Sequence, residues 1–184
     1  MARDLAPIVK RSRREGYALH PKAHKALVKR AANQGRPGGD RRGGGRNKSS
    51  QYALQLREKQ KVKRLYGLLE RQFANLVNES SRQKGQSGQV LLQLLERRLD
   101  NTVYRSGLAI SRPAARQLVS HGHFMLNGRR VDIPSLRIKA GDVIELRPTS
   151  AQKDYFKRID DVSPAIADII PGWLKVDRKK FIIT

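Results

Sequence analysis

The sequence of 184 residues contains no cysteine, which excludes disulfide bonds and metal sites built from thiolates. No run of apolar residues approaches the roughly 20 that span a bilayer, and residues 1–30 lack the continuous apolar segment of a secretory signal. Acidic residues are also scarce. We therefore expect a cytoplasmic protein whose fold relies on neither disulfides nor a cysteine-bound metal.

The charge of the chain is strongly positive, because 39 Lys and Arg stand against 16 Asp and Glu and leave a net charge of +23. It is also uneven: residues 1–66 hold 19 basic and 4 acidic residues. This excess predicts a polyanionic partner. With 38% hydrophobic residues, the chain is expected to form one large or two small domains with modest cores.

Residues 34–50 are rich in glycine, arginine and serine and show no hydrophobic periodicity. We expect residues 1–50 to be a partly flexible basic arm that orders on RNA, with a merely solubilising linker as the alternative. The glycines do not indicate a nucleotide-binding loop, because no Gly-Lys-Ser/Thr ends the segment and no buried strand precedes it. The phosphate contacts expected from the arm are Arg11, Arg13, Arg14, Arg36, Arg41, Arg42, Arg46 and Lys48.

A helix is predicted from about Arg112 to His121, with Ser111 as its N-cap and Gly122 as its stop. At 3.6 residues per turn, the apolar residues of this segment share one side. The opposite side carries hydrogen-bond donors that suit phosphate oxygens, namely Arg112, Arg116, Gln117 and Ser120.

A β-hairpin is predicted from Phe124 to Val131, because Asn127-Gly128 supplies the two positive φ angles of a type I′ turn. The turn presents Arg129 and Arg130 beside the end of the helix. A further strand is expected over residues 143–147, which makes this part of the chain an α+β module.

These residues resemble the S-four RNA-binding module, and the likeness extends upstream. Tyr52 to Lys61, Glu70 to Phe73 and Leu94 to Asn101 are similar to the S-four family of small-subunit ribosomal proteins, so that the resemblance covers roughly residues 50–147 closely. Many bacterial members of that family carry a cysteine zinc cluster near the N-terminus, whereas this sequence has none of those ligands. No cofactor or metal is therefore expected.

The resemblance implies a structural constituent of the small (30S) ribosomal subunit, located in the cytoplasmic ribosome. Such a protein binds the 5′ domain of 16S ribosomal RNA as a primary binder that nucleates assembly, and it lies near the messenger and decoding region. Further partners implied are messenger RNA and neighbouring small-subunit proteins, including the fifth. The alternative that uses the same module is a ribosome-associated accessory factor of the heat-shock or rescue type.

Helices are predicted over residues 50–66, 70–82 and 87–104, the last as one continuous helix that joins the helical part to the module. Arg57, Lys61 and Arg64 cluster on one side of the first helix, where a polyanion would supply the missing negative charge. A solvated charged face is the alternative. Lys59 and Lys63 are also expected to contact RNA, although they lie nearer the apolar side, where snorkelling alone would explain them.

The module is expected to contact RNA through eleven residues. They are Arg98, Arg105, Ser111, Arg112, Arg116, Gln117, His121, His123, Asn127, Arg129 and Arg130. For His121 and His123 the competing interpretation is a capped helix end, and we expect at least one of them to reach RNA.

No catalytic constellation is recognised, so the protein is not expected to be an enzyme. Arg98-Leu99-Asp100 resembles the catalytic motif of some pseudouridine synthases, but no separate catalytic domain follows and Asp100 is interpreted as structural. His20 and His24 have the spacing of a metal pair without further ligands, so we read them as solvated or RNA-facing.

The overall expectation is a mainly α protein with a small α+β module, comprising a helical N-terminal domain and an S-four-type RNA-binding domain. The predicted parts are an arm (1–50), a helical RNA-docking domain (51–96), the module (97–150) and a C-terminal tail (151–184). The tail is expected to pack on the other domains and to complete the helical one, with a short helix near residues 152–159 and Trp173 as a packing anchor.

Overall fold

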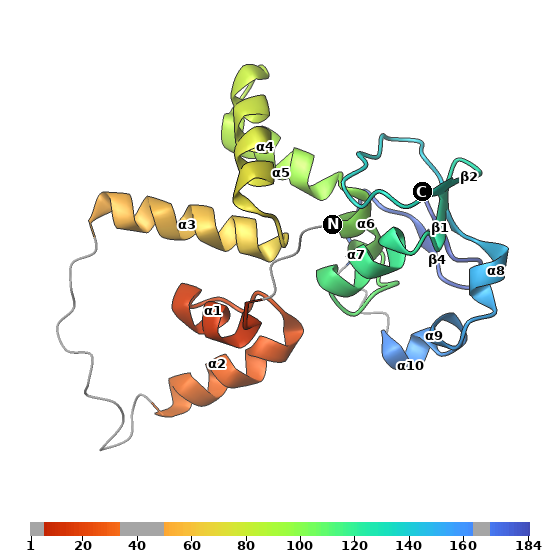
Figure 1. Ribbon diagram of the computed structural model, residues 1–184, viewed down its shortest axis with the longest axis horizontal. Helices are drawn as coiled ribbons and strands as arrows, with labels where there is room; N and C mark the ends of the chain where they lie inside the picture. The colour runs from red at the N-terminus through yellow and green to blue at the C-terminus, as the bar shows by residue number, and fades with distance from the viewer. Residues whose placement is uncertain (1–5, 34–49, 164–169) are drawn as a thin grey trace. The chain divides into compact units, whose positions relative to one another are not determined.

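The computed structural model describes residues 6–33, 50–163 and 170–184. The chain divides into two compact units, unit 1 (Met1–Ala74) and unit 2 (Asn75–Thr184), and most of their elements are labelled in Figure 1. The structure is mostly helical with a small antiparallel sheet, so the predicted fold class is confirmed. Among the described residues, no helix has the length and apolar character needed to cross a membrane.

Unit 1 consists of α1 (Ile8–Glu15), α2 (Pro21–Asn33), α3 (Gln51–Leu65) and the start of α4 (Glu70–Arg82). The predicted helices over 50–66 and 70–82 are therefore confirmed. Ser50 caps α3 by accepting a hydrogen bond from the Ala53 amide at 3.2 Å. The buried apolar residues of this unit are few, namely Leu19, Ala23, Tyr66, Leu68 and Phe73.

Within unit 2, a helix is broken at a point that the sequence did not predict. The helix expected over 87–104 is two helices, α5 (Ser87–Glu96) and α6 (Leu99–Arg105), so the prediction of one continuous helix was wrong. Arg98 is extended and forms an antiparallel bridge with Arg137, while the Leu99 amide donates to the Leu136 carbonyl at 2.8 Å. These backbone hydrogen bonds to a distant segment replace the helical hydrogen bonds that are lost at the break. The apolar periodicity of residues 87–104 continues through the break, so it gives no sign of it.

The sheet of unit 2 has five short strands in the order β2-β1-β3-β5-β4, each pair antiparallel. Strands β1 (Phe124–Leu126) and β2 (Arg129–Val131) form the predicted hairpin, and β3 (Ile144–Leu146) is the predicted further strand. The remaining strands, β4 (Val176–Asp177) and β5 (Ile182–Ile183), come from the tail.

The tail completes this sheet, which corrects the expectation that it completes the helical domain. Ile183 pairs with Ile144 of β3 and is 1% exposed, while Leu174 is 7% exposed. Trp173, expected to pack, is 52% exposed, so Leu174 provides the apolar contact instead. In place of one helix near 152–159, the chain forms three short ones, α8 (Pro148–Ala151), α9 (Asp154–Lys157) and α10 (Ile159–Val162).

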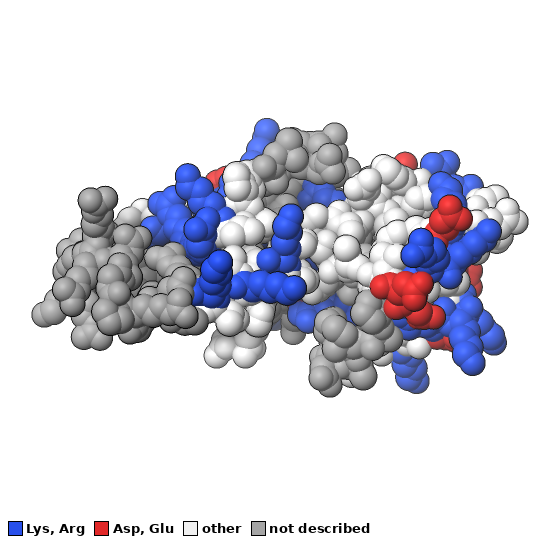
Figure 2. Space-filling view, turned by 90° about the horizontal axis from the view of Figure 1, so that it is seen from below, with Lys and Arg blue, Asp and Glu red and all other residues white. Residues whose placement is uncertain are grey.

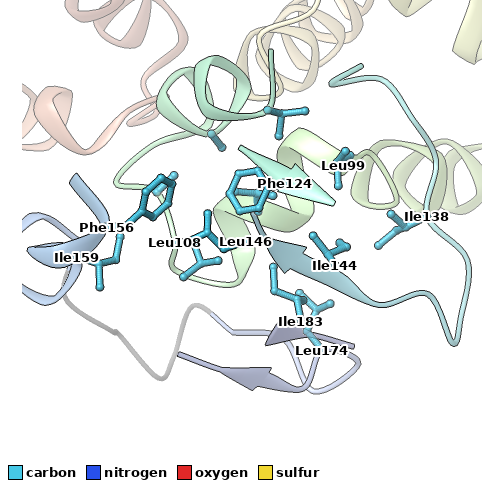
Figure 3. Close-up of a cluster of buried hydrophobic side chains, with 14 residues drawn as sticks. Leu99, Leu108, Phe124, Ile138, Ile144, Leu146, Phe156, Ile159, Leu174 and Ile183 are labelled. Atoms are coloured by element: carbon cyan, nitrogen blue, oxygen red, sulfur yellow. The ribbon is translucent and has the colours of Figure 1, made fainter. Parts of the chain in front are cut away.

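One hydrophobic core holds unit 2 together, and Figure 3 shows its side chains converging from the helices, the sheet and the tail. Phe124 is fully buried, and its ring meets that of Phe156 edge to face at 6.4 Å. Each such burial contributes about 1.5–3 kcal/mol. The α7 helix (Arg112–Ser120) adds Ala115 and Val119 to this core and turns its other face outward.

Candidate RNA interface

Helix α7 has Ser111 as its N-cap, as predicted, and the hydroxyl of Ser111 is used in capping the helix. This hydroxyl accepts a hydrogen bond from the Ala114 amide at 3.4 Å, and the residue is 4% exposed. Burial argues against the RNA contact expected of Ser111. Arg112 donates to the Asn101 side-chain oxygen at 2.9 Å and lies over the Tyr104 ring at 4.6 Å.

The outer face of α7 therefore combines the Arg112 guanidinium, held over a ring, with the side chains of Arg116 and Gln117. Arg116 is half-buried, whereas Gln117 is exposed. Because stacking on a ring restricts the Arg112 side chain, this helix presents a charge in a defined place.

The hairpin turn has the backbone that the sequence predicted, with φ of 49° at Asn127 and 76° at Gly128. The Asn127 side chain donates to the Asp142 carboxylate at 2.9 Å and accepts from the Val143 amide at 2.9 Å. A hydrogen bond from the Lys139 amide, and then the one from Asn127, lowers the pKa of Asp142. Asn127 thus fixes the turn that carries the exposed residues Arg129 and Arg130.

Cations from three segments meet around Gly122, just after α7. A Cβ atom at Gly122 would lie 2.7 Å from the Arg130 Nε, so the absence of a side chain lets that guanidinium lie against the backbone. Arg147 donates from Nη1 to the Gly122 carbonyl at 3.1 Å. We call Arg130, Arg147, Lys153 and the exposed His121 the Gly122 cluster.

Arg147 and Lys153 were missed by sequence reasoning. Arg147 directly follows β3, and a basic residue at the end of a strand in this module was the available signal. Lys153 lies close enough to His123 to lower the pKa of that imidazole, but no local pattern brings the two together. Only the packing of α8 beneath the helix end does so, through the His123–Ser150 contact described next.

His123 is a structural residue and not a surface donor. It is 7% exposed, its Nδ1 lies 2.9 Å from the Ser150 Oγ, and its ring meets Phe156 edge to face at 5.6 Å. Burial lowers the pKa of His123, and the nearby charges of Lys153, His121 and Arg147 lower it further. Of the two histidines, His121 is the exposed one.

Arg98 and Arg105 are also engaged within the protein. Arg98 is 5% exposed and binds both oxygens of Asp100, at 3.1 and 2.8 Å. Arg105 binds both oxygens of Glu96, at 3.1 and 2.8 Å. These ion pairs argue against the RNA contacts expected of the two arginines, and they give Asp100 a structural role.

In unit 1, the cluster predicted on α3 has acidic partners of its own. Arg64 forms an ion pair with Glu15, and Arg57 lies 3.5 Å from the same carboxylate. Lys61 lies 3.4 Å from Glu58 and 5.3 Å from the centre of the Tyr17 ring. The protein itself thus supplies much of the negative charge that we expected only from RNA.

Lys59 and Lys63 also share an acidic partner within the protein. Both bind Glu70, at 2.5 and 2.6 Å, instead of only lying along an apolar side. Their hydrogen bonds lower the pKa of Glu70 to about 2. The three side chains form an ion-pair network at the surface, and such networks contribute little to stability when exposed.

The predicted contacts of the arm are only partly described. Arg13 and Arg14 are exposed on the last turn of α1, where cations also favour the helix dipole. Arg11 is half-buried, and burial, followed by the charge of Arg64, lowers its pKa. Arg36, Arg41, Arg42, Arg46 and Lys48 lie outside the described residues.

Two classes of cation result. Within the described residues, Arg129, Arg130, Arg147 and Lys153 form no ion pair, whereas Arg57, Lys59, Lys61, Lys63, Arg64, Arg98 and Arg105 do. Figure 2 shows one face of the molecule, on which Lys and Arg side chains gather in groups with fewer Asp and Glu. No group of three potential metal ligands occurs in the parts of the chain that the structure describes.

Comparison with known proteins agrees with these features. Residues 3–96 match the ribosomal protein S4/S9 N-terminal domain, and residues 97–144 match the S4 domain. The small ribosomal subunit protein uS4 of Clostridioides difficile is 51% identical over 183 residues, covering 96% of this chain and 84% of the relative. The chain belongs to the uS4 family.

Other members of the uS4 family give the same result. The uS4 protein of Chlorobium limicola is 49% identical over 97% of this chain and 85% of its own length. The uS4A protein of Symbiobacterium thermophilum is 48% identical over 96% of this chain and 84% of its own length. The boundary between the two family domains, at residue 97, coincides with the break between α5 and α6.

Proposed function

We propose that this protein is a structural constituent of the small ribosomal subunit that binds 16S ribosomal RNA in the cytoplasmic ribosome. Membership of the uS4 family over almost the whole chain is the observation that carries this proposal. The protein works by binding, as ribosomal proteins of this kind generally do, and the Gly122 cluster supplies positive charge on a rigid scaffold for that task.

The finer proposal is that the RNA bound is the 5′ domain, that binding nucleates subunit assembly, and that the protein lies near the path of messenger RNA. Neighbouring small-subunit proteins, including the fifth, would be its protein partners. Fixed cations from a helix end, a hairpin and a strand end suit recognition of RNA shape through its backbone, because base edges in paired RNA are hard to reach.

The contact residues proposed in unit 2 combine predicted and newly found positions. They are Arg112, Arg116, Gln117, His121, Arg129, Arg130, Arg147 and Lys153. In unit 1 we propose Arg11, Arg13, Arg14, Arg57 and Lys61, the last two through the sides of their charged groups that face away from Glu15 and Glu58.

The experiment is binding of the purified protein to the 5′ domain of its small-subunit ribosomal RNA and to a structured competitor of equal length, over a salt series. Preference for the 5′ domain, with a steep loss of affinity as salt rises, supports the proposal. Equal affinity for both RNAs would favour the accessory ribosome-binding factor, and substoichiometric co-sedimentation with small subunits would favour it as well.

A further inference from the structure

Two features of the surroundings of Glu15 disfavour a negatively charged carboxylate. It is the only acidic residue of the sequence between residues 6 and 33, and its side chain is 1% exposed. It is the last residue of α1, immediately before the left-handed Gly16, where the helix dipole disfavours negative charge. Its Oε2 has no hydrogen-bond partner among the described residues. Burial of an anion in this way requires compensation by nearby cations.

The compensation comes from α3. Arg64 pairs with the Glu15 Oε1, and Arg57, two helical turns earlier on the same face, lies 3.5 Å from that atom. Arg11 is close enough for the charge of Arg64 to act on it. One carboxylate therefore faces two guanidinium groups, those of Arg57 and Arg64, and a net positive charge remains at this point of unit 1.

The two arginines of α3 differ in what remains available to a ligand. The Arg64 side chain is 16% exposed and is largely enclosed with Glu15, whereas the Arg57 side chain is 46% exposed. Arg57 thus contacts the buried carboxylate on one side and solvent on the other. A guanidinium held in this way presents its remaining donors in a fixed direction.

We propose that Glu15 is a positioning residue that gives unit 1 its selectivity for one RNA shape. It holds α1 against α3 and fixes the direction of the Arg57 guanidinium. Its negative charge also cancels one positive charge, which weakens the attraction of unit 1 for any RNA. Without it, Arg57 and Arg64 could follow the phosphates of many structures, whereas with it only an RNA that matches their positions gains the full contact. This inference rests on the proposed RNA-binding function.

The test compares Glu15→Gln with Glu58→Gln, which removes the same charge from an exposed pair on α3, where the Glu58 side chain is 69% exposed. Affinity is measured for the 5′ domain RNA and for the structured competitor. For Glu15→Gln we expect tighter binding of the competitor and a roughly tenfold fall in preference for the 5′ domain. Glu58→Gln should tighten binding of both RNAs alike, with preference unchanged.

A double-mutant cycle with Arg57→Gln asks whether Glu15 acts through that arginine. We expect Arg57→Gln to reduce the preference for the 5′ domain strongly when Glu15 is present and only weakly in the Glu15→Gln background. Additive effects of the two substitutions would overturn the proposal. Unfolding of α1 in Glu15→Gln would be seen as lost amide protection over Ile8–Glu15. In that case the double variant Glu15→Met with Arg64→Met replaces Glu15→Gln in the cycle, because an apolar pair can keep the two helices docked.

The outcomes separate the two proposals. If the wild-type protein shows no preference for the 5′ domain, the proposed function fails. If the wild-type protein shows the preference and the Glu15 and Glu58 variants keep it equally, the function stands and the role of Glu15 is refuted.

Discussion

Unit 1 and unit 2 are each stabilised internally by a different kind of interaction. Unit 2 has a core of fourteen buried hydrophobic residues drawn from Leu99 to Ile183. In unit 1, the long helix α3 buries none of its residues, and Tyr52 on it is 72% exposed. Its contacts are largely ion pairs with Glu15 and Glu70. Apolar burial withstands salt, and the exposed pairs of Glu70 are weak, so unit 2 is the firmer scaffold.

The same contrast applies to the cations. In unit 2, the Gly122 cluster has no acidic partners in the described chain, whereas the cations of α3 are restrained by carboxylates of the protein. The Gly122 cluster of unit 2 thus carries charge without ion pairs, whereas the cations of α3 in unit 1 are paired. Four substitutions or conditions, ordered by expected effect, would break or sharpen this comparison.

The largest effect is expected from Phe124→Ala, which empties the centre of the core of unit 2. We expect a loss of about 3–5 kcal/mol in the free energy of unfolding, from lost transfer energy and the cavity left behind. Urea unfolding measures the loss, and amide exchange locates it in unit 2, with α1 and α2 little changed. The control Trp173→Ala removes an aromatic side chain that is 52% exposed, and should cost less than about 1 kcal/mol. An equal loss in both units would contradict the comparison.

The second effect concerns Gly122, where φ is 68° and a Cβ would meet the Arg130 guanidinium. Gly122→Ala should cost about 1–2 kcal/mol of stability from the left-handed backbone, and it should displace Arg130. We expect weaker binding of the 5′ domain RNA, measured by titration. Gly128→Ala is the matched control, because φ is 76° there but the surrounding space is open. Its RNA affinity should hold; equal losses would show that strain alone matters.

The third effect compares a cation without an acidic partner with one that has such a partner. Arg129→Gln should weaken RNA binding and reduce the salt slope by about one, as expected for one lost phosphate contact. Arg137, which binds both oxygens of Glu79, provides the control. Arg137→Gln should leave the slope unchanged. A larger loss in Arg137→Gln would mean that ion pairing does not exclude a side chain from RNA contact.

The smallest effect is a pH dependence in unit 1. The pKa of Glu70 is lowered to about 2, so its pairs with Lys59 and Lys63 stabilise the fold fully above the ordinary pKa of 4.5. This contribution is lost as pH falls from 4.5 towards 2. Because the Glu70 side chain is 52% exposed, we expect less than about 1 kcal/mol. Unfolding of wild type and Glu70→Gln at pH 6 and pH 2.5 measures it. A difference that is as large at pH 2.5 as at pH 6 would contradict the assignment.

Local features of the fold could be predicted from the sequence. Ser111 and the residues after it predicted α7, and Asn127-Gly128 predicted the hairpin, because caps and turns depend on a few neighbouring residues. The break at Arg97-Arg98 could not be predicted, since it depends on backbone bonds to residues 136–138. The place of the tail was missed for the same reason, because a two-residue strand has no pattern of its own.

The sequence by itself determined the family, the excess of positive charge, and the helices and hairpin that present it. Only the tertiary structure decided which cations remain available. Glu15 meets Arg64 across 49 positions, and Glu79 meets Arg137 across 58. Arg130 reaches Gly122, and Arg147 closes the same point from the end of β3. Charge and local conformation are properties of neighbouring residues, whereas the pairing of charges depends on the packing of segments that are distant in the chain.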